Sequence, residues 1–358
     1  MPMKLGLGLY RSLITPENLA FARQAGATHL VIHLVDYFAG ASPVLDSGPP
    51  TRGWGITRNQ ERPWTLDELL AIKRQVNDAG LVWEAIENFD PSHWFDILLD
   101  GPRKRQQMEG LKRTIQAVGK AGIPIMGYNF SIAGVWGWTK GPTGRGGARA
   151  LTYDESAIDT TTPMPNGMVW NMVYDPDAPA GTVPPVTEAE LWERFAWFLR
   201  EILPVAEESG VRLALHPDDP PTTALRGAAR LVNHPDKYQR MLDLANSPAA
   251  ALECCVGSLA EMPAGDPYVA IDRYARAGRI GYVHFRNVRG TVPRYEEVFV
   301  DEGDLDMPRV VRLLHDAGYD GVLIPDHTPE MTCSAPWHAG MAFALGYMRA
   351  CLQMVERT

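Results

Sequence analysis

The sequence predicts an α/β protein in which residues 1–358 form one (β/α)8 barrel (TIM barrel) domain. Two patterns along the chain indicate this fold. Eight short apolar runs recur, and they are rich in β-branched residues, as buried parallel strands are. Six times, a helix-like stretch ends in a small residue followed by glycine, which suits the left-handed position that closes a helix, and an apolar run follows. Eight strands that alternate with helices through right-handed crossovers close most simply into a barrel.

The expected strands are these apolar runs, at residues 4–9, 29–35, 82–87, 123–130, 211–216, 250–255, 280–287 and 321–326. Helix starts fall between them. Thr15 precedes a proline that suits the first helical turn, and Thr65 and Thr187 each have a glutamate three residues later, which is the capping-box pattern. Apolar residues over 191–205 recur every three or four positions, which is the helical period. A doubly wound open sheet is the alternative, but no Gly-x-Gly-x-x-Gly turn follows the first expected strand.

Composition and charge exclude several classes of protein. The chain is 45% hydrophobic and 22% charged, which is typical of a globular domain rather than a disordered or fibrous one. It has 34 Lys and Arg against 43 Asp and Glu, and the formal net charge of −9 disfavours nucleic acid as a partner. No run of 18 apolar residues predicts a membrane span, and the first residues are too glycine-broken for a signal peptide.

Cysteine usage indicates the compartment. The four cysteines are Cys254, Cys255, Cys333 and Cys351. Two of them are adjacent and cannot easily pair with each other, so the sequence shows no disulfide framework. We therefore expect a reducing compartment, the cytoplasm.

Two expected connections are longer than barrel loops usually are. Residues 36–64 follow the second expected strand and residues 131–186 follow the fourth, so both insertions lie on the C-terminal face, where barrel active sites are found. The longer insertion carries two tryptophans and three cations: Trp136, Trp138, Lys140, Arg145 and Arg149. Either these residues pack on the rim of the barrel, or they form a lid that offers positive charge to an anionic ligand. Barrels with such loops are often homo-oligomers, which we expect here.

Four consecutive expected strands each deliver a metal-binding type of side chain to this face. They are His216, Cys255, His284 and Asp326, and imidazole, thiolate and carboxylate are common ligands of divalent ions. Each has an ordinary structural alternative when taken singly, such as a rim histidine, a small buried cysteine or a helix cap. Their agreement on one face favours a metal site. Asp218 and Asp219 are rival oxygen ligands, although they also fit a simple turn.

Several motifs resemble those of the mannonate dehydratases, metal-dependent sugar-acid dehydratases of hexuronate breakdown. These are His-Pro-Asp-Asp-Pro-Pro at 216–221, Cys-Val-Gly-Ser at 255–258, Val-His-Phe-Arg-Asn-Val at 283–288 and Ile-Pro-Asp-His at 324–327. The resemblance implies a xylose-isomerase-like barrel with Mn²⁺ held by His216, Cys255, His284 and Asp326. Because a thiolate is a soft ligand, Zn²⁺ and Fe²⁺ are alternatives.

The resemblance also implies a reaction, the removal of water from a D-mannonate-like aldonic acid to give a 2-keto-3-deoxy sugar acid. His327 matches the proton-transfer residue of the family. Asn129 and Arg286 are expected to contact the substrate, as is Lys140, which stands where the family has an arginine. Asn129 and Arg286 could instead be structural, with Arg286 pairing with one of the aspartates at 304 and 306.

The chain departs from the family pattern at one catalytic position. A family tyrosine that follows the Asp-His pair and assists proton transfer is missing here. His338 lies in that stretch and can take its place as the second catalytic residue, or the acid is absent. Two alternative functions stay open. One is a metal-dependent sugar isomerase or epimerase, although those enzymes typically use two glutamates with aspartate and histidine. The other is a catalytically silent sugar-acid binding protein.

Overall fold

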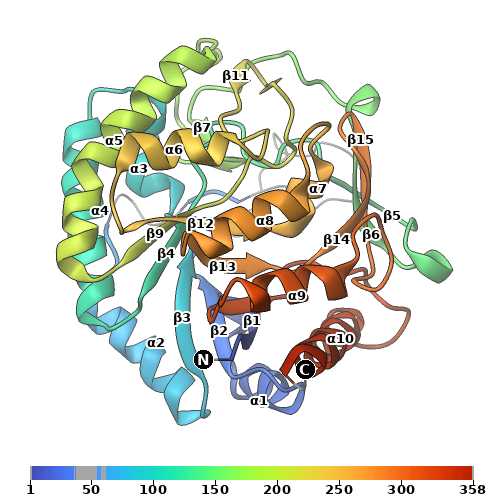
Figure 1. The fold of residues 1–358 in the computed structure, drawn as a ribbon. Coiled ribbons are helices and arrows are strands. Elements are labelled where there is room, and N and C mark those ends of the chain that lie inside the picture. The colour runs from blue at the N-terminus through green and yellow to red at the C-terminus, as the bar shows by residue number, and fades with distance from the viewer. Residues whose placement is uncertain (1, 36, 38–54, 58–61, 357–358) are drawn as a thin grey trace.

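The computed structural model describes residues 2–35, 37, 55–57 and 62–356, and eight parallel strands form a closed barrel at its centre (Figure 1). The predicted (β/α)8 fold is confirmed. Around the barrel, each strand pairs with its two neighbours in the order β1-β16-β13-β12-β9-β4-β3-β2. These strands are β1 (Lys4–Tyr10), β2 (His29–His33), β3 (Val82–Glu87), β4 (Ile125–Tyr128), β9 (Arg212–Leu215), β12 (Ala250–Cys255), β13 (Ile280–His284) and β16 (Val322–Ile324).

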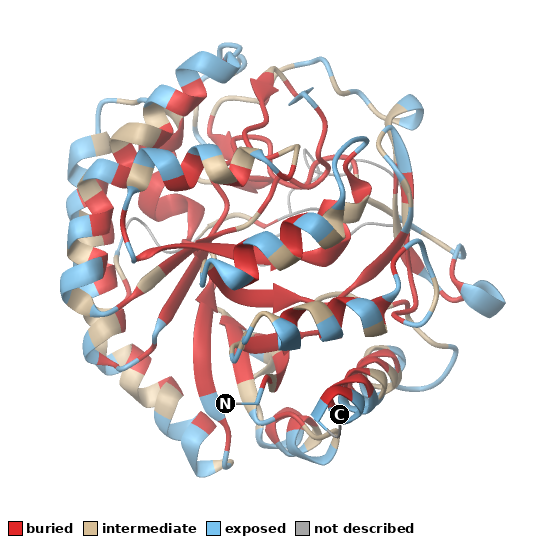
Figure 2. Cartoon of the chain, in the orientation of Figure 1, coloured by how far each residue is buried: buried red, intermediate tan, exposed pale blue. Residues whose placement is uncertain are grey.

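Helices cover the outside of the barrel and bury their apolar stripes against it (Figure 2). The main ones are α1 (Pro16–Gln24), α2 (Leu66–Asp78), α3 (Pro91–Leu99), α4 (Lys104–Lys120), α5 (Glu188–Ser209), α6 (Lys237–Ala245), α7 (Val256–Glu261), α8 (Pro267–Arg276), α9 (Met307–Asp316) and α10 (Pro336–Glu356). Thr65 and Thr187 form the predicted capping boxes, and Thr15 accepts a hydrogen bond as the N-cap of α1. None of the helices in the described ranges is long and apolar enough to span a membrane.

Strand lengths differ from the expectation at the C-terminal face. β2 ends at His33, β4 ends at Tyr128, and the run expected at 280–287 divides into β13 and the separate strand β14 (Asn287–Thr291). Apolar composition continues past these strand ends because the departing residues are still buried. Burial alone therefore does not mark where parallel pairing stops.

The longer insertion forms part of an antiparallel sheet that the sequence did not predict. Its strands β5 (Thr139–Gly141) and β6 (Ala150–Asp154) join β15 (Arg294–Val298) and β14 in the order β14-β15-β6-β5. Residues that follow β4 and β13 are thus held together at the mouth of the barrel. The insertion also contains the two-stranded pair β7 (Met168–Val169) and β8 (Met172–Val173). Of the other expected insertion, 36–64, residues 36, 38–54 and 58–61 lie outside the described residues.

The barrel interior changes from apolar to polar along its axis. Its apolar part is a layer of mostly small and β-branched side chains: Val31, Ala85, Ile125, Ala214, Ala251, Tyr282, Val322 and Ile324. Nearer the C-terminal ends of the strands, the buried side chains are charged or polar, including Glu87, Glu253 and His284. Buried ionisable groups are costly unless they are paired or bind an ion, so this end of the barrel is the candidate site.

Candidate metal centre and active site

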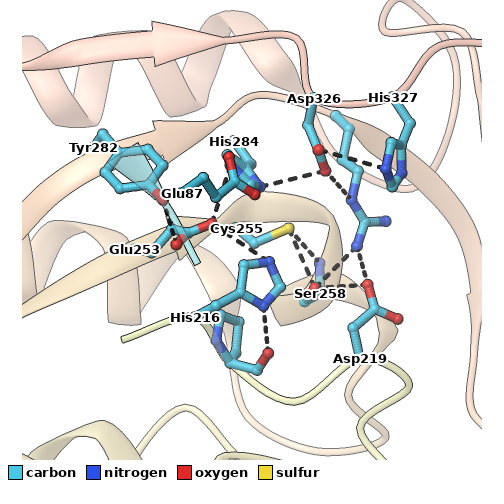
Figure 3. Close-up of polar contacts among 12 residues, drawn as sticks. Glu87, His216, Asp219, Glu253, Cys255, Ser258, Tyr282, His284, Asp326 and His327 are labelled. Carbon is cyan, nitrogen blue, oxygen red and sulfur yellow. Dashed lines mark hydrogen bonds and ion pairs between the residues drawn. The ribbon is translucent and has the colours of Figure 1, made fainter. Parts of the chain in front are cut away.

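Three metal-binding side chains meet at the ends of neighbouring strands. His216 directly follows β9, Cys255 ends β12 and His284 ends β13. One ring nitrogen of each histidine and the Cys255 sulfur all lie within 4.8 Å of one another (Figure 3). The strand order β13-β12-β9 explains the meeting, because parallel neighbours bring their carboxyl ends to the same edge.

A backbone carbonyl and the neighbouring charges set the protonation of these donor atoms. His216 Nδ1 lies 2.5 Å from the Pro217 carbonyl oxygen and donates its proton there, which reserves Nε2 for a metal. Burial lowers the pKa of His216, but Glu253 and Cys255 outweigh burial and raise it to about 9, so Nε2 gives up a proton when a metal binds. Burial raises the pKa of the Cys255 thiol, but Arg286, His216 and His284 outweigh burial and bring the pKa to about 5. Cys255 is therefore a thiolate at neutral pH, which is the form that binds metal. Burial raises the pKa of neighbouring Cys254, which packs in the hydrophobic core.

Asp326 approaches from the other side of His284. Its Oδ2 lies 3.3 Å from His284 Nδ1, and it forms a second donor group with Glu87 and His284. The four predicted ligands are therefore arranged around His284, which belongs to both groups, rather than as one compact set of four atoms. Asp326 has φ +61°, a left-handed conformation that is uncommon outside glycine and costs backbone energy.

The donor set suits a divalent cation. Both ring nitrogens of His284 and Oε1 of Glu253 are buried and lack a hydrogen bond of good geometry, although Glu253 Oε1 lies 3.0 Å from His284 Nε2. Buried polar atoms without hydrogen bonds are rare and call for an explanation such as an ion. Burial also raises the pKa of Glu253 to about 8, and the carboxyl accepts a hydrogen bond from the Tyr282 hydroxyl.

A cavity opens beside these donors. Of the predicted site residues, Asn129, His216, His284, Asp326 and His327 line it. Trp138 from the long insertion also lines it, and its ring meets the His327 ring edge-on at 5.3 Å. His327 Nδ1 lies 3.0 Å from Glu297 Oε1. Burial lowers the pKa of His327, but Asp326 and Glu297 outweigh burial and raise it to about 9.

Arg286 does not line this cavity. It is 2% exposed and lies among four carboxylates, those of Asp219, Glu261, Glu297 and Asp326. Neither of the partners considered from the sequence is among them: Asp304 accepts a hydrogen bond from the Gly290 amide, and Asp306 caps α9. Arg286 is thus enclosed by acidic groups, which leaves no open face of the guanidinium toward the cavity.

Comparison with known proteins agrees with this geometry. The family model for D-mannonate dehydratase (UxuA) matches residues 17–350. The chain belongs to the mannonate dehydratase family. It is 32% identical over 276 residues to mannonate dehydratase 2 of Halalkalibacterium halodurans, covering 74% of this chain and 79% of that protein. It is 33% identical over 276 residues to mannonate dehydratase of Streptococcus pneumoniae, covering 74% of each.

Solved structures agree at the level of the whole chain. The crystal structure of a mannonate dehydratase from Streptococcus suis serotype 2 superposes with a TM-score of 0.78 at 27% identity, covering 99% of this chain and 94% of that one. A xylose isomerase domain protein from Planctomyces limnophilus gives a TM-score of 0.60 at 12% identity and full coverage of both chains, a likeness of fold alone. The resemblance predicted from the motifs is confirmed. Mannonate dehydratases are hydro-lyases.

Two predicted residues of this mannonate dehydratase homologue lie away from the donors. His338, in the first turns of α10, pairs through Nε2 with Asn18 Oδ1 of α1 at 2.9 Å and lines neither described cavity near the donors. The reason is that α10 packs beside α1 on the outside of the barrel. Lys140 lines an adjoining cavity with Arg149, and its Nζ lies 2.7 Å from Glu330 Oε1.

The rival oxygen ligands are already engaged. Asp219 lines the cavity, but it accepts hydrogen bonds from Tyr295 and Ser258 and pairs with Arg286. The preceding aspartate, Asp218, accepts a hydrogen bond from the Val232 amide. Both therefore serve as structural partners in the described structure.

Sequence reasoning missed several side chains that line the mannonate dehydratase cavity, among them Tyr10, His33, Tyr37 and Glu87. A usable signal was present in the strands. His33 and Glu253 are ionisable residues inside the runs 29–35 and 250–255, and Glu87 ends the run 82–87. Charged residues are rarely buried without a partner, so each of these residues was a candidate for the site.

Proposed function

We propose that this protein removes water from D-mannonate, or a closely related aldonic acid, to give a 2-keto-3-deoxy sugar acid. The observation that carries the proposal is the sulfur of Cys255 beside two imidazoles, at a cavity shared with Asp326 and His327, in a chain of this family. Ionisable and aromatic side chains line this cavity together, a combination that suits a sugar acid.

We propose His216, Cys255, His284 and Asp326 as the ligands of a divalent ion. The mixture of thiolate, imidazole and carboxylate donors supports a transition metal, and we favour Mn²⁺, with Zn²⁺ and Fe²⁺ as alternatives. When bound, such an ion would supply positive charge that stabilises the enediolate formed as C2 loses its proton.

The protein's own residues position the substrate and move protons. We propose that His327 transfers a proton to or from the substrate, because it lines the cavity and Glu297 and Trp138 hold its ring. Asn129 is buried in the cavity wall and offers an amide to a substrate hydroxyl. Lys140 lines the adjoining cavity with Arg149, and the two cations can attract an anion there. We assign Arg286 to holding Asp326 in place, since the two are 3.2 Å apart.

One assay tests this function. The metal-stripped protein is incubated with Mn²⁺ and a panel of aldonic acids, and 2-keto acid formation is followed. We expect product from D-mannonate only when the ion is present. Absence of a 2-keto acid from every aldonic acid, with metal bound, would contradict the proposal.

A sugar isomerase or epimerase is the second candidate. Glu87 and Glu253 add two glutamates beside His284 and Asp326, the residue types those enzymes typically use. The same incubation, repeated with ketoses and followed by chromatography, distinguishes the two functions. Binding without turnover would instead indicate a silent sugar-acid binding protein.

We further propose that residues 1–358 form a single domain, with 36–64 and 131–186 as insertions on the C-terminal face. Pairing of β6 with β15 supports this for the second insertion, because it joins the insertion to the barrel rim. We propose a cytoplasmic homo-oligomer. The free state of all four cysteines supports a reducing compartment, and light scattering measures the oligomer size.

A further inference from the structure

The proposed dehydration needs two proton transfers, one from C2 and one to the departing C3 hydroxyl. His327 accounts for one of them. The family tyrosine is missing, and His338 pairs with Asn18 on the outside of the barrel. A second proton-transfer group must therefore come from another part of the cavity wall.

His33 lies on that wall with a carboxylate beside it. It ends β2, and the β2–β3 register pairs it with Glu87, which ends β3. His33 Nε2 lies 3.2 Å from Glu87 Oε2, and His33 lines both the cavity beside the metal-binding donors and the adjoining one. The same Glu87 oxygen lies 3.3 Å from His284 Nε2, so one carboxylate separates His33 from a proposed ligand.

The position of His33 relative to His327 suits a pair of groups acting on one substrate. β1 lies between β2 and β16 in the barrel, and His327 follows the end of β16. Tyr10, at the end of β1, stands in register with His33, and their rings are 4.7 Å apart. The two histidines therefore flank the end of β1, and both line the same cavity.

Of the ionisable side chains Tyr10, His33 and Tyr37 on this part of the cavity wall, His33 is the one that can accept a proton. Burial raises the pKa of both Tyr10 and Tyr37, so these phenols keep their protons. Burial lowers the pKa of His33 and outweighs the opposing effect of Glu87. The lowered pKa favours the neutral imidazole. His33 Nε2 faces the Glu87 carboxylate at 3.2 Å without a hydrogen bond of good geometry. A proton that the charge of Glu87 favours on Nε2 leaves the lone pair of the ring on Nδ1, as in other histidine–carboxylate pairs that act as bases. The Tyr37 hydroxyl forms a long hydrogen bond with Nδ1, at 3.5 Å, which substrate must replace.

We propose that His33, oriented by Glu87, is the base that removes the C2 proton; this inference rests on the proposed dehydration. The proton passes to His33 Nδ1, and the electron pair of the C2–H bond moves into the substrate carboxylate as an enediolate. That pair then forms the C2–C3 double bond. The C3–O bond breaks, and the hydroxyl leaves as water with a proton from His327. The resulting enol becomes the 2-keto acid by moving its hydroxyl proton to C3. Exchange with solvent removes the proton from His33 and restores that of His327.

The test compares His33→Asn with a matched control on the same strand. His29 begins β2 and also faces a glutamate of β3, with His29 Nε2 3.7 Å from Glu84 Oε2, but it lies at the opposite end of the barrel. We expect His33→Asn to lower kcat about 10²–10⁴-fold, the usual range for a lost base, with manganese content unchanged. His29→Asn should keep full activity. His33→Gln is the second variant should the asparagine protein fold poorly.

Two further measurements separate a base from a structural residue. In deuterated water, His327→Asn should still exchange the C2 hydrogen of the substrate, whereas His33→Asn should not. A 3-deoxy-3-fluoro aldonic acid loses fluoride without needing a proton, so it should restore turnover in His327→Asn but not in His33→Asn. C2 exchange or full kcat in a folded, manganese-loaded His33 variant would overturn the inference. A wild-type protein that does not dehydrate any aldonic acid would refute the proposed function itself and, with it, this inference.

Discussion

Replacing Arg286 by methionine removes the positive charge that holds four buried carboxylates together below the mouth of the barrel. Its Nη1 lies 2.5 Å from Glu261 Oε1 and 3.2 Å from Glu297 Oε1, its Nε lies 3.2 Å from Asp326 Oδ2, and it also pairs with Asp219. Methionine fills a similar volume without a charge. The carboxylates then face one another in a dry environment with their shared partner gone.

The expected cost follows from these contacts. Removing one partner of a buried ion pair typically destabilises a protein by about 3–5 kcal/mol, because the other charge stays buried and unpaired. Burial already raises the pKa of Glu261 well above its ordinary value, so this carboxyl can take up a proton when Arg286 is lost. The loss of stability is therefore smaller than the sum over all four ion pairs. At about 2.1 cal/mol/K per residue, the unfolding entropy of this chain is about 0.75 kcal/mol/K, so we expect Tm to fall by about 4–7 °C.

Scanning calorimetry of the wild type, Arg286→Met and Arg286→Lys measures this effect. Lysine keeps the charge but loses the planar fork, so we expect its Tm to lie between the other two. The methionine variant should also lose activity, because Asp326 and the Glu297 partner of His327 are no longer held. A Tm for Arg286→Met equal to or above that of the wild type would refute the account of Arg286 as the charge that these carboxylates require.

Three further substitutions test other parts of the site. Cys255→Ser replaces a thiolate with a neutral hydroxyl, so the dissociation constant for Mn²⁺ should rise at least about tenfold, as followed by elemental analysis after gel filtration; unchanged stoichiometry would remove Cys255 from the ligand set. His327→Asn should lower kcat about 10²–10⁴-fold while the metal stays bound, and full activity would contradict its proton-transfer role. His338→Gln should leave kcat unchanged in the same assay, because His338 pairs with Asn18 outside the cavity; a large loss of kcat without a loss of Tm would restore it as a catalytic candidate.

Much of the cluster of candidate metal ligands followed from the sequence because of how parallel strands are arranged. His216, Cys255 and His284 each stand at the end of an apolar run, and neighbouring parallel strands place such positions at one edge. The capping boxes at Thr65 and Thr187 were predictable for a similar reason, since each depends on residues only three apart. Local periodicity and spacing are properties of the chain itself.

The sequence could not show which way the side chains at the strand ends face or which partners they meet. Arg286 was expected to contact the substrate because it is an arginine in a family motif. The carboxylates around it come from four distant segments, and only the packing of those segments encloses it. His338 lies close in sequence to His327, yet the start of α10 carries it away to α1. Partners of this kind depend on the path of the chain between elements, which short-range patterns do not record.

The sequence by itself determined that eight strands and their helices form a barrel and that metal-binding residue types gather at one end of it. Only the tertiary structure decided that Asp326 groups with Glu87 and His284, that the long insertion forms a sheet with β15, and that His33 faces Glu87. The physical reason is that strand register and the closure of the barrel between β1 and β16 bring side chains together that lie far apart along the chain. That closure, with the register it imposes, sets which ionisable groups share a cavity.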